Sequence, residues 1–111
     1  MIELIILEHL KAKLPEHVDL EKPNSSLGNY VVFEKTSGGK SNHLPSATFA
    51  FQSYGKSLYE AVELNNRVKE AVESLIELDE IRGLDLNSDY NFTDTTTKEY
   101  RYQAVYDIRY Y

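Results

Sequence analysis

The stretch SATFAFQSYGKSLYEA, residues 46–61, decides the fold of this chain, because an alternating strand passes into a helix within it. Residues 46–54 alternate from one face to the other, a pattern typical of a strand with one face on the core. Ser57 stands three residues before Glu60, which predicts a capping box that satisfies free backbone N–H groups reciprocally. We expect Gly55 to supply the flexible corner of this strand–helix unit.

Two amphipathic helices are predicted from apolar residues that recur every three or four positions. The helix after the corner carries this pattern from Ala61 to Leu75, with acidic residues on its solvated side, and we expect it to reach about Leu78. A first helix is predicted over residues 2–14, where Pro15 ends it.

Further strands are predicted near residues 17–20, over 30–35, over 81–87 with 88–92 extending or bending it, and over 100–110. Residues 36–45 are too long for a tight turn and show no apolar period, so we expect a mobile, exposed loop there. The sequence therefore predicts an α+β fold: a mainly antiparallel sheet packed against two helices, with a long mobile hairpin loop.

Most of the nine tyrosines are expected in the core, although a tyrosine-rich edge can also bind a partner. Four of them share the parity of two apolar residues on the last strand: Tyr100, Tyr102, Tyr106 and Tyr110. Packing under a helix predicts this pattern, and Tyr111 is expected to be exposed.

Length and composition limit the possible functions. A chain of 111 residues is expected to form one domain, residues 1–111, around one core. No apolar run approaches the roughly 20 residues that span a bilayer, so no membrane association is predicted. The absence of cysteine excludes disulfides and thiolate chemistry. A net charge of −6 argues against binding nucleic acid through its phosphates, but it suits a channel through which a polyanion passes without sticking.

Two stretches resemble ligand-binding loops only in part. Residues 37–41, SGGKS, are similar to the end of a phosphate-binding loop, but Glu34 replaces its first glycine and no helix is expected to follow. Residues 85–89 begin like a calcium loop, but Tyr90 and Thr96 occupy its essential glycine and glutamate positions. We interpret this second stretch as a solvated turn, with a weak cation contact as the alternative.

No residues are predicted to be catalytic, cofactor-binding or metal-ligating. His9, His17 and His43 lie on a helix, a connection and a loop, so their spacing does not predict zinc binding. Asp107 and Glu34 are carboxylates on strands, but the sequence offers them no nucleophile and no third group. We therefore expect a protein that is not an enzyme.

The order of predicted elements resembles the tail terminator, or tail completion, family of long-tailed bacteriophages. Residues 47–61 (ATFAFQSYGKSLYEA), followed by Asn-Arg-Val at 66–68 and the aromatic strand at 100–111, resemble the hairpin-to-helix unit and closing strand of that family. Residues 93–99 resemble its polar lead-in to the last strand. The likeness spans nearly the whole chain.

This resemblance implies an α+β domain that forms a six-membered ring on the tail tube, stops tube polymerisation and joins the tail to the head. The implied partners are copies of the chain itself, the tail tube protein and the head–tail connector protein, with DNA passing through the lumen and no sequence-specific nucleic acid binding. The implied location is the head–tail junction of a virion assembled in bacterial cytoplasm. A contact with a neighbouring subunit or with the tail tube is predicted at these loop residues: Gly38, Gly39, Lys40, Asn42 and His43.

A small α+β module that binds a protein or peptide is the alternative function. Such a module uses a sheet edge or the face of its long helix as its binding surface. It predicts a stable monomer that needs no tube partner.

Overall fold

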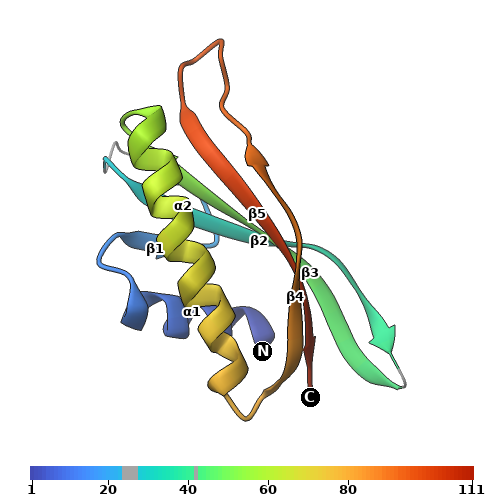
Figure 1. Cartoon of the computed structure of the whole chain (residues 1–111). Coiled ribbons are helices and arrows are strands. Elements are labelled where there is room, and N and C mark those ends of the chain that lie inside the picture. Colours follow the sequence, from blue (N-terminus) through green and yellow to red (C-terminus); the bar gives the residue numbers. More distant parts are fainter. Residues whose placement is uncertain (24–27, 42) are drawn as a thin grey trace.

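A computed structural model describes residues 1–23, 28–41 and 43–111 of the chain (Figure 1). The elements in chain order are α1 Ile2–Lys13, β1 His17–Asp19, β2 Tyr30–Ser41, β3 Leu44–Gly55, α2 Leu58–Glu73, the 3₁₀ helix η1 Ser74–Glu77, β4 Ile81–Asn91 and β5 Tyr100–Tyr110. The strands form one sheet in the order β1-β2-β3-β5-β4, in which β1 and β2 pair in parallel and the other neighbours are antiparallel. The fold is α+β, as predicted.

The core lies between the two helices and one face of the sheet. Its centre is a group of aromatic rings from β2, β3 and β5, among which Phe33 stacks on Phe51 with ring centroids 5.4 Å apart. Tyr106 meets Phe51 edge-on at 6.0 Å. Side chains from both helices cover these rings: Ile2, Ile6, Leu10, Leu64, Val68 and Val72. Truncating one buried aromatic ring of this kind costs about 3–5 kcal/mol of stability.

Gly55 is needed for close approach rather than for flexibility. A Cβ atom at this position would lie 2.4 Å from the backbone nitrogen of Ala61 and 2.9 Å from its Cα. The end of β3 therefore passes directly against the first turn of α2, at a distance that a side chain would prevent. The expected flexible corner is a tightly packed one.

Half of the expected capping box forms at the start of α2. The Glu60 backbone N–H donates to Ser57 Oγ at 3.2 Å, so Ser57 is the N-cap. Among the described residues, the Glu60 carboxylate accepts from Ser57 Oγ and from Asn29 Nδ2, both at 3.2 Å, in place of the Ser57 backbone N–H. The helix start is thereby tied to the segment that precedes β2.

The long helix is α-helical only as far as Glu73, four residues short of the end of η1. Ser74 Oγ donates to the carbonyl of Ala71 at 2.6 Å and lies 2.7 Å from His9 Nε2 on α1. A serine that bonds back to a preceding carbonyl competes with the α-helical pattern, and the last turn tightens to 3₁₀ geometry.

The expected mobile loop over residues 36–45 is not confirmed. β2 and β3 pair through this region as a hairpin, with Gly38 opposite Ala47 and Ser41 opposite Leu44. Cross-strand backbone hydrogen bonds hold these residues. Because both strands are solvated here, their sequence shows no alternation of apolar and polar residues that would have predicted the pairing. Of the turn, His43 has a positive φ of 67°; Asn42 lies outside the described residues.

The second half of the chain forms two long paired strands. β4 continues through residues 88–91, which extend the predicted strand at 81–87, with register shifts between Ile81 and Gly83 and between Leu86 and Ser88. Residues 85–89, interpreted from sequence as a solvated turn, therefore belong to a strand. Asp85 and Asp89 sit opposite Asp107 and Ala104 of β5.

The tyrosine prediction is correct in part. Tyr106 is fully buried, whereas Tyr100, Tyr102 and Tyr110 are only partly buried and Tyr111 is 70% exposed. Tyr106 packs edge-on against Phe51 and reaches Glu73 of α2, whereas the residues nearer the two ends of β5 are less covered. Burial and a 2.6 Å hydrogen bond from the Tyr106 hydroxyl to Glu73 together raise the pKa of Tyr106.

We predict that Gly55→Ala lowers the free energy of unfolding by about 1–3 kcal/mol, because the added methyl group forces backbone atoms apart. Urea unfolding followed by circular dichroism measures the change. Gly39→Ala is the matched control, since its Cβ would lie 4.0 Å from the nearest neighbouring atom, Ser46 Oγ. Equal stability of the two variants would contradict the close-approach role of Gly55.

Candidate interaction surfaces

The sheet face opposite the helices carries an ordered polar network. Alternate residues of β3, β4 and β5 point to this face, where Gln52 Nε2 donates to Gln103 Oε1 at 2.8 Å. Gln103 Nε2 in turn donates to the hydroxyl of Tyr90, and the Tyr54 hydroxyl donates to Gln52 Oε1 at 3.3 Å. Hydrogen bonds between side chains thus hold this face, together with a small buried cluster of Tyr30, Val32 and Tyr54.

Arg101 connects this network to an aromatic cluster. Its guanidinium lies 4.5 Å from the ring centroid of Phe92 and 5.6 Å from that of Tyr54, and its Nη1 donates to the Tyr54 hydroxyl at 3.0 Å. Cation–π contacts of this kind hold an arginine in one orientation. The Arg101 side chain is therefore pre-positioned on the surface.

The hairpin of β2 and β3 projects away from both helices (Figure 1). Residues 34–40 of β2 are exposed along this arm. β1 pairs only with the first three residues of β2, Tyr30 to Val32, so the outer edge of the rest of β2 faces no other described strand. An unpaired strand edge offers backbone donors and acceptors to another chain.

The predicted contact residues that the structure describes gather at the tip of this arm: Gly38, Gly39, Lys40 and His43. Gly38 and Gly39 line a hollow of about 300 Å³ together with residues of β3 and β5 that include Asp107 and Arg109. Added Cβ atoms at the two glycines would approach no atom of Ser46 closer than 3.8 Å. The fold itself therefore does not require glycine at either position. Asn42 falls outside the described residues.

A second hollow, of about 350 Å³, lies at the start of α2. Three lysines and one glutamate line it: Lys22, Lys56, Lys98 and Glu99. Its floor includes Tyr30 and Tyr54, whose rings stack with centroids 4.5 Å apart. The Lys22 Nζ donates to Glu99 at 2.5 Å, and this bond raises the pKa of Lys22. We call Lys22, Lys56 and Lys98 the basic end of the molecule.

Sequence reasoning missed the basic end, because its lysines come from three separate segments of the chain. The folded chain also brings Gly28 here: it has a φ of +76°, and a Cβ at this position would come within 2.9 Å of Lys56 Cε. Because Gly28 has no side chain, the aliphatic part of the Lys56 side chain packs against its backbone at the wall of the hollow.

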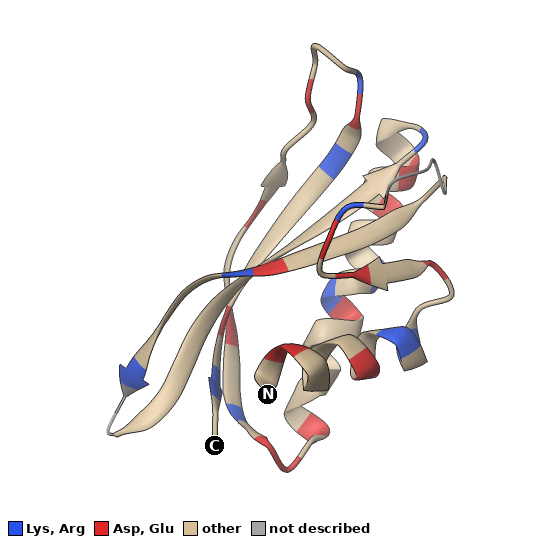
Figure 2. Cartoon of the chain, turned by 180° about the vertical axis from the view of Figure 1, so that it is seen from behind, with Lys and Arg blue, Asp and Glu red and all other residues tan. Residues whose placement is uncertain are grey.

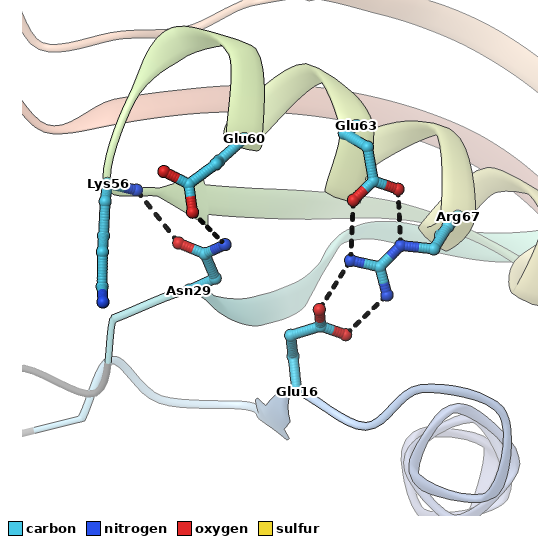
Figure 3. Close-up of polar contacts among 6 residues, drawn as sticks. All are labelled: Glu16, Asn29, Lys56, Glu60, Glu63 and Arg67. Atoms are coloured by element: carbon cyan, nitrogen blue, oxygen red, sulfur yellow. Dashed lines mark hydrogen bonds and ion pairs between the residues drawn. The ribbon is translucent and has the colours of Figure 1, made fainter.

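Arg67 joins two segments with a pair of bidentate contacts (Figure 3). Its Nη1 and Nη2 donate to the Glu16 carboxylate at 2.8 and 2.6 Å, and its Nε and Nη2 donate to Glu63 at 2.7 and 3.1 Å. Hydrogen bonds from Arg67 lower the pKa of Glu16, and those bonds raise the pKa of Arg67. These bonds attach the turn after α1, which carries Glu16, to α2. We infer that the cluster of Glu16, Glu63 and Arg67 stabilises the fold and does not bind a ligand.

Asn29 ties a second segment to α2 (Figure 3). Its Oδ1 accepts from the Lys56 backbone N–H at 3.0 Å, while its Nδ2 donates to Glu60. The side chain therefore bridges the chain before β2 to the first turn of the helix.

Of the carboxylates considered from sequence, Asp85 and Asp107 are cross-strand neighbours, and each of the four is placed differently. Asp85 accepts from Arg109 at 2.8 Å, whereas Asp89 accepts from Asn65 and Lys69 on α2. Asp107 accepts from Thr48 Oγ1 at 2.7 Å, and Glu34 is exposed on β2. Within residues 1–23, 28–41 and 43–111, no three histidine, aspartate or glutamate side chains gather where they could hold a metal ion.

His9, His17 and His43 lie apart, on α1, β1 and the hairpin turn. Burial lowers the pKa of His9, which contacts Ser74. In the part of the chain that the structure describes, neither helix is long and apolar enough to cross a membrane.

No protein-family model matches this sequence, and no curated protein is significantly similar to it.

We predict that Arg67→Ala lowers the free energy of unfolding at neutral pH by about 1.5–3 kcal/mol, the range for hydrogen bonds to charged groups. Arg67→Lys, which keeps the charge but loses the planar fork, recovers only part of this loss. Urea unfolding of the three proteins measures both effects.

The same contact predicts a pH dependence. The pKa of Glu16 is lowered in the folded chain, so its contribution is present above its ordinary value of 4.5 and is lost as pH falls through the lowered pKa. The stability difference between wild type and Arg67→Ala should shrink over that acid range. A difference that stays constant down to the acid limit of folding would show that Glu16 is not the partner responsible.

Proposed function

We propose that this chain is a non-enzymatic phage assembly protein that caps the tail tube as a ring, ends its polymerisation and joins the tail to the head connector. The resemblance of residues 47–61 and 100–111 to the tail terminator family supplies this function. The supporting structural observation is the arm formed by β2 and β3, which extends past the helices (Figure 1). A projecting hairpin of this kind offers a subunit of a ring a surface for a neighbouring copy or for the tube beneath it.

The tip of the arm is suited to close backbone contact. Gly38 and Gly39 present no side chains, and the adjoining outer edge of β2 offers free backbone groups. Glycines inside a strand commonly mark the place where another backbone approaches. We assign the tip to contact with a neighbouring subunit or with the tail tube protein, with Lys40 and His43 at its rim.

The charge of the chain supports the proposed channel. A net charge of −6 discourages adsorption of DNA to a lumen, since like charges repel. The proposed partners are other copies of the chain, the tube protein and the connector protein. The proposed location is the head–tail junction of the virion, after assembly in the bacterial cytoplasm.

A protein- or peptide-binding module is the second candidate, and the unpaired edge of β2 favours it. An extended peptide adds to such an edge as a further strand, through main-chain hydrogen bonds. This candidate requires a monomer that binds its peptide without a tube.

We predict that deleting the gene from a source phage or an inducible prophage yields filled heads without tails and separate tails of abnormal length. Electron microscopy of the lysate shows both products. Normal virions would remove the tail-cap function and favour the binding module.

We predict that Gly38→Tyr abolishes tail joining while the chain stays folded, because the tyrosine side chain would occupy the space that a partner needs. Tyrosine suits a strand, and the site is open within the subunit. Complementation of the deletion measures joining, and thermal unfolding measures folding. Lys11→Tyr, at an exposed position of α1, is the matched control and should restore normal virions. Full complementation by Gly38→Tyr would remove the arm tip from the interface.

A further inference from the structure

The end of α2 carries an unusual concentration of acidic residues. The last turn of α2 contains no basic residue, and Glu77, Asp79 and Glu80 follow it, all exposed. Helix C-termini carry a partial negative charge that favours cations, so carboxylates there repel both the helix end and each other. We call Glu77, Asp79 and Glu80 the acidic end; acidic residues mark this turn in Figure 2.

The charged groups around the acidic end do not neutralise it. Glu8 of α1 lines the same shallow hollow as Glu80, which adds a further negative charge. Among the described residues, the ion pairs join none of Glu77, Asp79 and Glu80 to a cation. Arg82, the nearest arginine in sequence, donates instead to the carbonyl of Tyr110 at 3.4 Å. A positively charged partner would relieve the repulsion.

The basic end has the opposite balance. Its three lysines face one carboxylate, Glu99, which leaves two positive charges around the hollow in a chain of net charge −6. Among the described residues, Lys56 and Lys98 take part in no ion pair, and the N-terminus of α2 adds its own partial positive charge. Glu60 and Asp94 keep their negative charges, but they do not line the hollow, and hydrogen bonds from Asn29 and from the backbone of Thr96 hold their carboxylates.

The two ends lie at opposite ends of α2 (Figure 1). The 16 residues of the helix alone separate them by about 24 Å at 1.5 Å per residue. A two-fold pair with antiparallel α2 helices brings unlike ends together twice and is complete with two copies, so it builds no larger ring. A head-to-tail arrangement brings them together once per pair, and a repeated head-to-tail contact is the heterologous kind that closes into a ring.

We propose that the basic end of one copy, Lys22, Lys56 and Lys98, docks on the acidic end, Glu77, Asp79 and Glu80, of a second copy of this chain. The occupant is identified by charge complementarity between two surfaces that every copy carries. This inference rests on the ring of the proposed function and names the two different patches that such a ring needs. Salt weakens the contact, because both ends are exposed.

Two charge-reversal variants test the contact. The basic-end variant is Lys56→Glu with Lys98→Glu, and the acidic-end variant is Glu77→Lys with Glu80→Lys. We expect wild type to self-associate at low salt and high concentration, and each variant alone to associate at least about tenfold more weakly. Analytical ultracentrifugation measures association, and circular dichroism with thermal unfolding checks that each variant is folded.

An equal mixture of the two variants is the decisive sample. Each acidic surface then meets a basic one on the other variant, so association should return to the wild-type level. The control for net charge is Lys11→Glu with Lys13→Glu, which makes the same charge change as the basic-end variant on α1 and should associate like wild type.

Zero-length cross-linking locates the contact directly, even when it is short-lived. Carbodiimide couples a lysine amine to a carboxylate in ion-pair contact, and a mixture of isotopically labelled and unlabelled wild type distinguishes links between copies from links within one. We expect links between copies that join Lys56 or Lys98 to Glu77, Asp79 or Glu80. Mass spectrometry of the cross-linked peptides identifies them.

Several results would overturn the contact: a wild type that stays monomeric and gives no links between copies, links located elsewhere, or variants that associate like wild type. Self-association that is abolished by inorganic phosphate and gives no lysine–carboxylate links would assign the basic end to an anion instead. If the mixture restores association but the gene deletion gives normal virions, the contact stands and the tail-cap function falls. If the deletion gives tailless heads but no links join the two ends, the tail-cap function stands and the contact falls.

Discussion

The close passage of Gly55 against the backbone of Ala61 is the constraint on which the rest of the structure depends. It fixes where α2 leaves β3, and therefore the path of that helix across the sheet. Along this path α2 covers the aromatic centre of the core with Leu64, Val68 and other apolar side chains. Because α1 packs on the same side, all of the apolar burial of the main core is concentrated on one face of the sheet. The other face is free to carry polar side chains.

This division of the sheet explains how the polar residues are used. Some of them secure the fold: Arg67 and Asn29 tie the segments after α1 and before β2 to the helix. On the uncovered face, Gln52 and Gln103 bond to each other instead of to a partner. The groups left for binding lie at the periphery, on the arm and at the two ends of α2. Arg101 is fixed over the ring of Phe92 and is also partly exposed on the surface.

The surfaces described at the periphery are shallow and exposed rather than enclosed, and the proposed assembly function uses them as contacts between proteins. The chain is elongated, with principal extents of 43 × 25 × 23 Å, and its charges are separated along α2. Separated unlike charges favour directional contact between identical subunits and set partner orientation. The arm then remains available for the tube or for a neighbour. In the proposed assembly, the charged ends set the orientation of neighbouring subunits. Backbone contact at Gly38 and Gly39 joins the arm to a neighbour or to the tube.

The sequence by itself determined the α+β class, both helices and the approximate position of every strand, because alternation, helical period and N-capping are set by neighbours a few residues apart. It did not determine the extent of the hairpin at residues 36–45, where pairing across strands replaces any apolar pattern. The contact of Ser74 with His9 of α1 and the partial burial of Tyr100, Tyr102 and Tyr110 depend on how distant elements pack. The basic end is likewise assembled from Lys22, Lys56 and Lys98, which only the folded chain brings together. Contacts between distant segments leave no local period in a sequence, so the tertiary structure alone decided these features.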